Sequence, residues 1–300
     1  MTALMKLPSL PPVPYGVPYD MWNRMSLETT SQCNRRCHFC PVSQRPAKVQ
    51  SMSDELYTRI VNQLPTDWDG TVQWFFVNEP LFDKKRHQRI RQLRTHAPNC
   101  TIHVTTNWEI MEKKSFDDQV LEAANLIRSG VSSLNLNAYR DAAQFNSYRK
   151  VAIHASIASN AEFIYDHCWK RDKRPRISAS NMTSPVDLHT WSGFYNGDDV
   201  IKTRPKKCPR AHKHLVVMWD GKVPLCCAVN PTGAEILGDA NIESLNDIWN
   251  SRRFFEYRWN LQNGQRKDQC EGCVERVSFP GCVHKVENPN AKTYHPNQTF

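Results

Sequence analysis

Three cysteines near the amino terminus have the spacing of a metal-binding loop. Cys33, Cys37 and Cys40 form a C-x3-C-x2-C pattern within TTSQCNRRCHFCP, directly after a segment that we predict to be a strand. Three thiolates on one loop can hold three corners of an iron-sulfur cubane, which leaves the fourth iron open to a small molecule. Zinc is the alternative metal for such a loop, because closely spaced cysteines also bind zinc.

A second group of cysteines occupies the C-terminal third of the chain. Its members are Cys208, Cys226, Cys227, Cys270, Cys273 and Cys282. Taken alone, this region also fits a zinc module of the treble-clef or ribbon kind, which binds nucleic acid. Cys100 and Cys168 lie in predicted framework segments, and we interpret both as core residues.

The elements that must position the first loop follow an α/β pattern. Between residues 22 and 182, short β-rich runs alternate with amphipathic helical stretches, as in βα units around a parallel sheet. We expect strands at 25–29, 72–77, 102–106, 132–138 and 176–181. We expect helices at 54–64, 83–96, 116–128 and 142–173, and one more at 245–257.

On these residues the chain resembles the radical S-adenosylmethionine (SAM) superfamily. Its members carry the C-x3-C-x2-C motif after the first strand of a partial (β/α)6 TIM-like barrel, with an aromatic residue before the last cysteine, and Phe39 fills that place. The resemblance implies a [4Fe-4S] cluster on Cys33, Cys37 and Cys40, with SAM chelated to the open iron. It implies reductive cleavage of SAM to a 5'-deoxyadenosyl radical, which takes a hydrogen atom from the substrate. A reductant such as a flavodoxin or ferredoxin is the implied partner.

The same resemblance points to residues that contact SAM. The superfamily has a Gly-Gly-Glu-Pro-like segment after the second strand, and WFFVNEPLF matches its last part without the glycines. The residues that it implies as cofactor-binding are Phe39, Asn78, Glu79, Pro80, Thr106, Asn107, Asn135 and Asn137. For Asn135 and Asn137 the alternative is a polar strand end that satisfies its own loop.

The C-terminal cysteines resemble the SPASM/twitch extension of radical SAM enzymes. Cys208, Gly221 and Cys226 match its C-x(9–15)-G-x4-C opening. A full SPASM domain holds two clusters and usually seven cysteines, whereas six are present here, so we expect one auxiliary [4Fe-4S] cluster. Its implied ligands are Cys208, Cys226, Cys270 and Cys273, the twitch arrangement of radical SAM dehydrogenases of aminocyclitol biosynthesis, and Cys282 is able to replace one of them. Cys227 is either a buried spare or a catalytic hydrogen-atom donor.

Composition sets the expected organisation. We expect a proline-rich arm at 1–20, a radical SAM core at 21–200, an auxiliary cluster domain at 201–286 and a tail at 287–300. No run approaches the ~18 apolar residues of a spanning helix, and the first residues hold too many prolines for a secretory signal. These features predict a cytoplasmic protein.

Charge bears on the substrate. The chain has 39 Lys and Arg against 30 Asp and Glu, a net charge of +9, with basic stretches at 84–94, 170–176 and 204–210. Such surfaces suit phosphates, although they also serve as solvated faces. We therefore expect dehydrogenation, epimerisation or isomerisation of an anionic or nucleotide-type substrate, with a modified thymidine in phage DNA as one candidate.

Other functions stay open on the sequence alone. One alternative is a radical SAM maturase of a peptide or of an aminoglycoside or other sugar-type substrate. A second is a zinc-dependent nucleic-acid-binding protein, and a third is a non-catalytic iron-sulfur scaffold or electron carrier.

Overall fold

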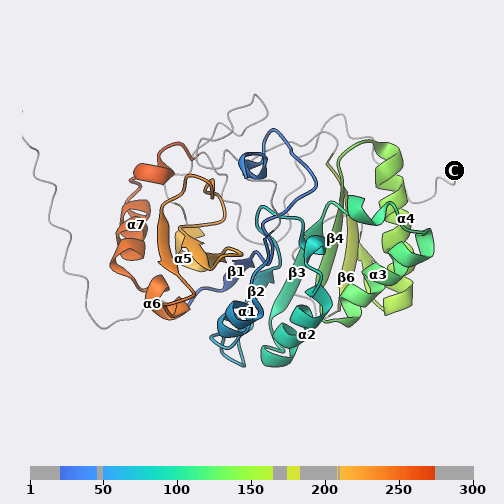
Figure 1. The fold of residues 1–300 in the computed structure, drawn as a ribbon, viewed down its shortest axis with the longest axis horizontal. Coiled ribbons are helices and arrows are strands. Elements are labelled where there is room, and N and C mark those ends of the chain that lie inside the picture. Colours follow the sequence, from blue (N-terminus) through green and yellow to red (C-terminus); the bar gives the residue numbers. More distant parts are fainter. Residues whose placement is uncertain (1–20, 46–49, 165–173, 183–207, 209, 274–300) are drawn as a thin grey trace, which may run out of the picture.

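A parallel sheet forms the centre of the molecule (Figure 1). The computed structural model describes residues 21–45, 50–164, 174–182, 208 and 210–273. The predicted arm at 1–20, the tail at 287–300, Cys168 and Cys282 lie outside the described residues. No helix within those ranges is long and apolar enough to cross a membrane.

Seven strands make up this sheet, and all its strand pairs are parallel. They are β1 (Arg24–Leu27), β2 (Thr71–Gln73), β3 (Thr101–Thr106), β4 (Ser133–Ala138), β5 (Glu162–Ile164), β6 (Arg176–Asn181) and β7 (His214–Val217). Their order is β5-β6-β4-β3-β2-β1-β7. The predicted α/β class is confirmed.

The two faces of the sheet differ in chemistry, because side chains alternate along each strand. One face is apolar and fully buried, and carries Met25, Leu27, Val72, Ile102, Val104, Leu134, Leu136, Ile177, Leu215 and Val217. The opposite face is polar, and carries Ser26, Gln73, His103, Thr105, Asn135, Asn137, Ser178, Ser180 and His214. Parallel sheets are usually apolar on both faces because helices cover both. A polar face therefore indicates a surface that binds a ligand.

Four helices pack against the apolar face through a shared core. They are α1 (Asp54–Val61), α2 (Arg86–His96), α3 (Phe116–Arg128) and α4 (Ala142–Ser159). Ser53, Ser115 and Asp141 cap three of them, each accepting a hydrogen bond from a first-turn backbone N–H. The capping residues explain why these helices begin where the sequence pattern places them.

The C-terminal region is continuous with the sheet. β7 pairs with β1 from Arg24 opposite His214 to Leu27 opposite Val217, so a strand from the predicted auxiliary region extends the core sheet. The hairpin of β8 (Lys222–Pro224) and β9 (Ile236–Asp239) follows, and Gly221 lies in the turn between β7 and β8 at a φ of 86°. Such a φ favours glycine. The helices are α5 (Arg210–Lys213), α6 (Leu245–Trp249) and α7 (Arg252–Gln262). Figure 1 shows α6 and α7 at the opposite end of the molecule from α3 and α4.

Three element boundaries differ from the sequence prediction. The helix expected over 142–173 ends at Ser159, because Asn160 adopts a left-handed conformation with φ 55°, and β5 follows. The helix expected over 245–257 is two helices, since Ser251 caps a new one. The strand expected over 72–77 ends at Gln73, and the residues after it form a loop at the carboxyl edge.

The basic stretch of α2 is largely engaged within the protein. Arg89 is 3% exposed and lies between Asp83 and Asp54, at 3.0 and 2.8 Å. Arg94 donates to the backbone carbonyl that follows α3 at 2.7 Å, and Arg86 pairs with a glutamate of α3 at 2.7 Å. These cations fix α2 against its neighbours, whereas Lys84, Lys85 and Arg91 are exposed. A phosphate-binding surface stays a prediction, and the basic stretches at 170–176 and 204–210 lie largely outside the described residues.

Arg89→Leu tests this role. We expect the free energy of unfolding to fall by about 3 to 5 kcal/mol, because the variant leaves the carboxylate of Asp83 buried without its partner. Anaerobic urea denaturation followed by circular dichroism measures the change. Arg91→Leu removes an exposed arginine of the same helix and should change stability by less than about 1 kcal/mol. Equal effects of the two variants would contradict the assignment.

Candidate functional site

The first cysteine loop lies at the carboxyl edge of the sheet, directly after β1, where α/β folds place their sites. Burial raises the pKa of the Cys33 thiol to about 12 and that of Cys40 to about 11. The neighbouring sulfurs raise both further: Cys37 and Cys40 act on Cys33, and Cys37 acts on Cys40. The three half-buried sulfurs therefore face one another.

A set of three thiolates on one loop fits an iron-sulfur cubane. Among the described residues, no three His, Cys, Asp or Glu side chains are grouped closely enough to hold a single metal ion. A cubane bonds each thiolate to a separate iron, so its ligands lie further apart than the ligands of one ion. A bound metal also reverses the pKa pattern, since a coordinating thiol is deprotonated.

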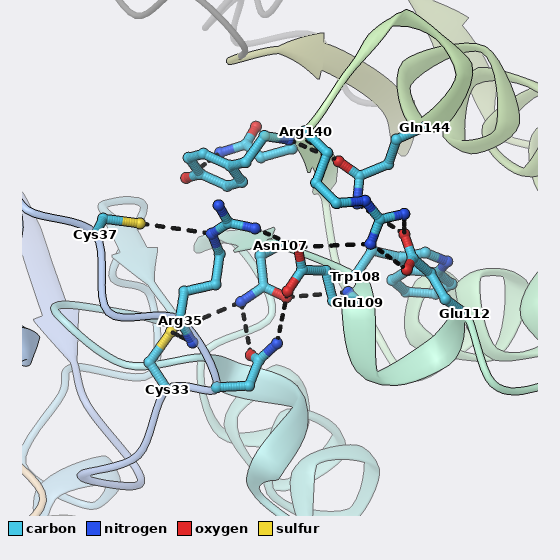
Figure 2. Close-up of polar contacts among 12 residues, drawn as sticks. Cys33, Arg35, Cys37, Asn107, Trp108, Glu109, Glu112, Arg140 and Gln144 are labelled. Atoms are coloured by element: carbon cyan, nitrogen blue, oxygen red, sulfur yellow. Dashed lines mark hydrogen bonds and ion pairs between the residues drawn. The ribbon is translucent and has the colours of Figure 1, made fainter.

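Two side chains donate to the sulfurs of this loop (Figure 2). The Nε of Arg35 lies 3.5 Å from Cys37 Sγ, and Nδ2 of Asn107 lies 3.6 Å from Cys33 Sγ. Arg35 also forms an ion pair with Glu109 and lies over a tyrosine ring at 4.6 Å. Nitrogen donors to the sulfurs are among the features that set the potential of a cluster. Sequence reasoning missed this contact of Arg35 with a cysteine of the loop, although its place between two of the cysteines was visible.

Glu79 joins the cysteine loop to the end of β3. Its carboxylate is 2% exposed and accepts hydrogen bonds from Thr106 Oγ1 at 2.6 Å, the Asn107 N–H at 2.7 Å and the Leu81 N–H at 3.0 Å. Its own backbone N–H donates to the carbonyl of Gln32 at 2.7 Å. Burial raises the pKa of Glu79 to about 7 against the effect of these hydrogen bonds. Three of the roughly four acceptor positions of a carboxylate are used, so one is left for a ligand.

The neighbours of Glu79 shape the same loop. Asn78 accepts a hydrogen bond from the Phe76 N–H through its side chain at 3.0 Å, which closes a turn where the superfamily has glycine. Pro80 opens a short 3-10 helix over Pro80–Phe82. Phe39 packs edge to face with His38, with ring centroids 5.2 Å apart. Contact of these three residues with SAM stays a prediction.

The predicted asparagines of β4 lie on the polar face of the sheet. Asn135 donates to the side chain of Asn137 at 2.7 Å, and it accepts from the hydroxyls of Ser178 and Ser180 at 3.0 Å each. The four residues form one network of neutral hydrogen-bonding groups across β4 and β6. These bonds within the network are consistent with the alternative that the two asparagines satisfy their own strand ends. Contact of Asn135 and Asn137 with SAM stays a prediction.

Glu28 is a second buried carboxylate, which sequence reasoning missed. It is fully buried, pairs with Arg45 at 2.8 Å and accepts a hydrogen bond from the Val77 N–H at 3.2 Å. Burial raises its pKa, and Arg45 opposes that effect. The available signal was an acidic residue directly after the first strand. Glu28 holds the carboxyl ends of β1 and β2 together beside the cysteine loop.

The structure brings the four predicted auxiliary cysteines together from three segments of the chain. Cys208, Cys226, Cys270 and Cys273 are all buried. Burial raises the pKa of Cys226 and of Cys270, and neighbouring sulfurs raise both further: Cys227, Cys270 and Cys208 act on Cys226, while Cys273 and Cys208 act on Cys270. This donor set fits a second cubane with all four corners ligated by the protein.

Cys227 follows Cys226 in the chain and lies next to Arg210 and His214. Arg210 Nη1 donates to Cys227 Sγ at 2.8 Å, and Nε2 of His214 lies 2.9 Å from the hydroxyl of Ser26. Burial raises the pKa of Cys227, but Arg210 and His214 lower it to about 6. Cys227 and Cys40 also pack against one small apolar cluster, formed by Phe76, Val77, Val216 and Met218. Cys227 thus connects the two cysteine sets.

Sequence models of known families agree with this geometry. The model of the radical SAM superfamily matches residues 27–150, and the model of the SPASM iron-sulfur cluster-binding domain matches residues 208–274. The chain belongs to the radical SAM superfamily and is a radical SAM enzyme. It carries a SPASM domain C-terminal to the radical SAM domain.

Individual relatives extend along most of the chain. An S-adenosyl-L-methionine-dependent 2-deoxy-scyllo-inosamine dehydrogenase of Niallia circulans is 23% identical over 257 residues, which cover 84% of this chain and 93% of the relative. The crystal structure of BtrN in complex with AdoMet and 2-DOIA has a TM-score of 0.66 at 21% identity, covering 86% of this chain and 94% of BtrN. A selenomethionine form of BtrN in an open conformation gives 0.58 at 19% identity, with coverages of 85% and 93%. At these identities the solved structures establish the fold.

Glu79→Gln tests the junction around the cysteine loop. We expect the free energy of unfolding to fall by about 1 to 3 kcal/mol. The NH2 group of the glutamine side chain cannot accept a hydrogen bond, so one of the donors that the Glu79 carboxylate satisfied loses its acceptor. We also expect less iron at the N-terminal loop after reconstitution, measured by iron analysis and absorbance. Glu55→Gln, an exposed change at the start of α1, is the matched control. Wild-type stability of Glu79→Gln would refute this role.

Proposed function

We propose that this radical SAM enzyme dehydrogenates a hydroxyl-bearing substrate of the aminocyclitol or sugar type. The observation that carries the proposal is the polar face of the sheet, which extends from β6 to β7 and presents amide, hydroxyl and imidazole groups. Such groups recognise hydroxyls by hydrogen bonds. The relative from Niallia circulans is named as a dehydrogenase of 2-deoxy-scyllo-inosamine, which supports this substrate class.

The chain supplies two cysteine sites for this reaction. We assign Cys33, Cys37 and Cys40 to the cluster that binds SAM, and the four buried C-terminal cysteines to one auxiliary cluster. When bound, SAM and the two clusters would supply two things. One is a 5'-deoxyadenosyl radical that removes a hydrogen atom from the substrate, and the other is an acceptor for the one electron that the substrate then loses. The hydroxyl of the substrate releases a proton, so the product is a ketone. An external reductant delivers the first electron, as radical SAM enzymes require.

The remaining residues bind and orient. We assign the free acceptor position of Glu79 to the ammonium of SAM, and Thr106 and Asn107 to holding that carboxylate in place. Asn135 and Asn137 are assigned to hydroxyl groups of SAM or of the substrate. We further propose 21–200 as the radical SAM core and 201–286 as the auxiliary region.

An anionic, nucleotide-type substrate is the second candidate. The net charge of +9 favours it. The arginines of α2 that pair within the fold speak against it, because they are not available to phosphates. The dehydrogenase proposal therefore has the better support.

Loss of the first cysteine set tests the chemistry. In protein reconstituted anaerobically with iron and sulfide, we expect dithionite and SAM to yield 5'-deoxyadenosine, measured by liquid chromatography. Cys33→Ala, Cys37→Ala and Cys40→Ala should each abolish this product and leave the absorbance of the C-terminal cluster. Cys100→Ala, in the core, should retain it. Zinc without iron would favour a binding module, and iron without cleavage of SAM would favour a scaffold.

Substrate class is tested by oxidation of a small probe. With SAM and reductant, 2-deoxy-scyllo-inosamine should lose two hydrogens by mass spectrometry, whereas a thymidine-containing duplex should not. Asn135→Ala removes an amide that we assign to hydroxyl groups of the ligand, and it leaves two serine hydroxyls without their acceptor. We therefore expect the free energy of binding of the probe to weaken by about 1 to 3 kcal/mol. Asn125→Ala, on α3, is the control. Modification of the duplex with no reaction of the probe would reverse the proposal.

A further inference from the structure

A guanidinium lies against the auxiliary cysteines. Arg210 opens α5, two residues after Cys208, and its Nη1 donates to Cys227 Sγ at 2.8 Å. Its charge also interacts with the sulfurs of Cys226 and Cys208. Arginine stays charged at every relevant pH, so this positive charge is a fixed feature of the site.

A second arginine adds to the same field. The charge of Arg266 acts on the sulfurs of Cys208 and Cys270, and is partly offset by that of Asp268. The charges of Arg210 and Arg266 therefore both act on the auxiliary sulfurs, from two different segments of the chain.

We propose that Arg210, aided by Arg266, raises the reduction potential of the auxiliary cluster. This inference rests on the proposed function. Reduction adds one negative charge to a cluster, and a neighbouring cation and N–H···S bonds stabilise the reduced form. Arg210 acts through its charge and through the sulfur of Cys227, which shares an apolar cluster with Cys40. The electron released by the substrate is thereby drawn towards the C-terminal site.

The test is a redox titration monitored by electron paramagnetic resonance. It uses the full chain with Cys33→Ala, Cys37→Ala and Cys40→Ala, so that the auxiliary cluster alone gives the signal. Arg210→Gln should lower the midpoint potential, and Arg210→Lys should restore most of the difference because it keeps the charge. Arg252→Gln, whose exposed side chain pairs with Glu256 at 3.1 Å on α7, should leave the potential unchanged.

The outcomes separate this inference from the proposed function. If the midpoint potential shifts no more in Arg210→Gln than in Arg252→Gln, the inference is overturned and the proposed function is unaffected. If Arg210→Gln assembles no cluster, Arg266→Gln is decisive: a lower potential supports the inference, and an unchanged one overturns it. Failure of the cysteine-substituted parent chain to bind any cluster overturns the proposed function, and the inference with it.

Discussion

The hydrogen bonds of one buried carboxylate hold the functional edge of this protein together. Glu79 accepts from the end of β3 and, through its backbone, donates to the residue before the first cysteine. A buried carboxylate is costly unless several donors satisfy it, so its neighbours have little freedom to move. The position of the cysteine loop therefore depends on the end of β3, and Glu28 makes a similar connection between β1 and β2.

The two-sided sheet explains how a small enzyme of this superfamily combines stability with binding. The apolar face takes part in a continuous core with four helices, whereas the polar face is left for hydrogen bonding. Asn135 is the clearest case, since its amide gathers two serine hydroxyls from the next strand. Polar groups that satisfy one another in this way can exchange those bonds for bonds to a ligand at low cost.

Local patterns predicted much of this arrangement. The α/β class, most strands and the two cysteine sets follow from periodicity and spacing, because alternation and caps act over a few residues. The end of α4 at Asn160 and the addition of β7 next to β1 depend on backbone conformation and pairing between distant segments, which no local pattern records. For the same reason the role of Arg89 was not predicted: sequence shows that Arg89 is basic, but not that Asp83 lies 3.0 Å from it.

The pairing of β7 with β1 has a consequence for how this chain can be divided. A protein truncated before residue 208 would expose β1 as an open edge, with a row of unsatisfied N–H and C=O groups that invites aggregation. The amino-terminal portion alone would therefore lack the strand that covers this edge of its sheet. Gene fusions or split versions of this protein must keep the strand supplied by its carboxyl-terminal half.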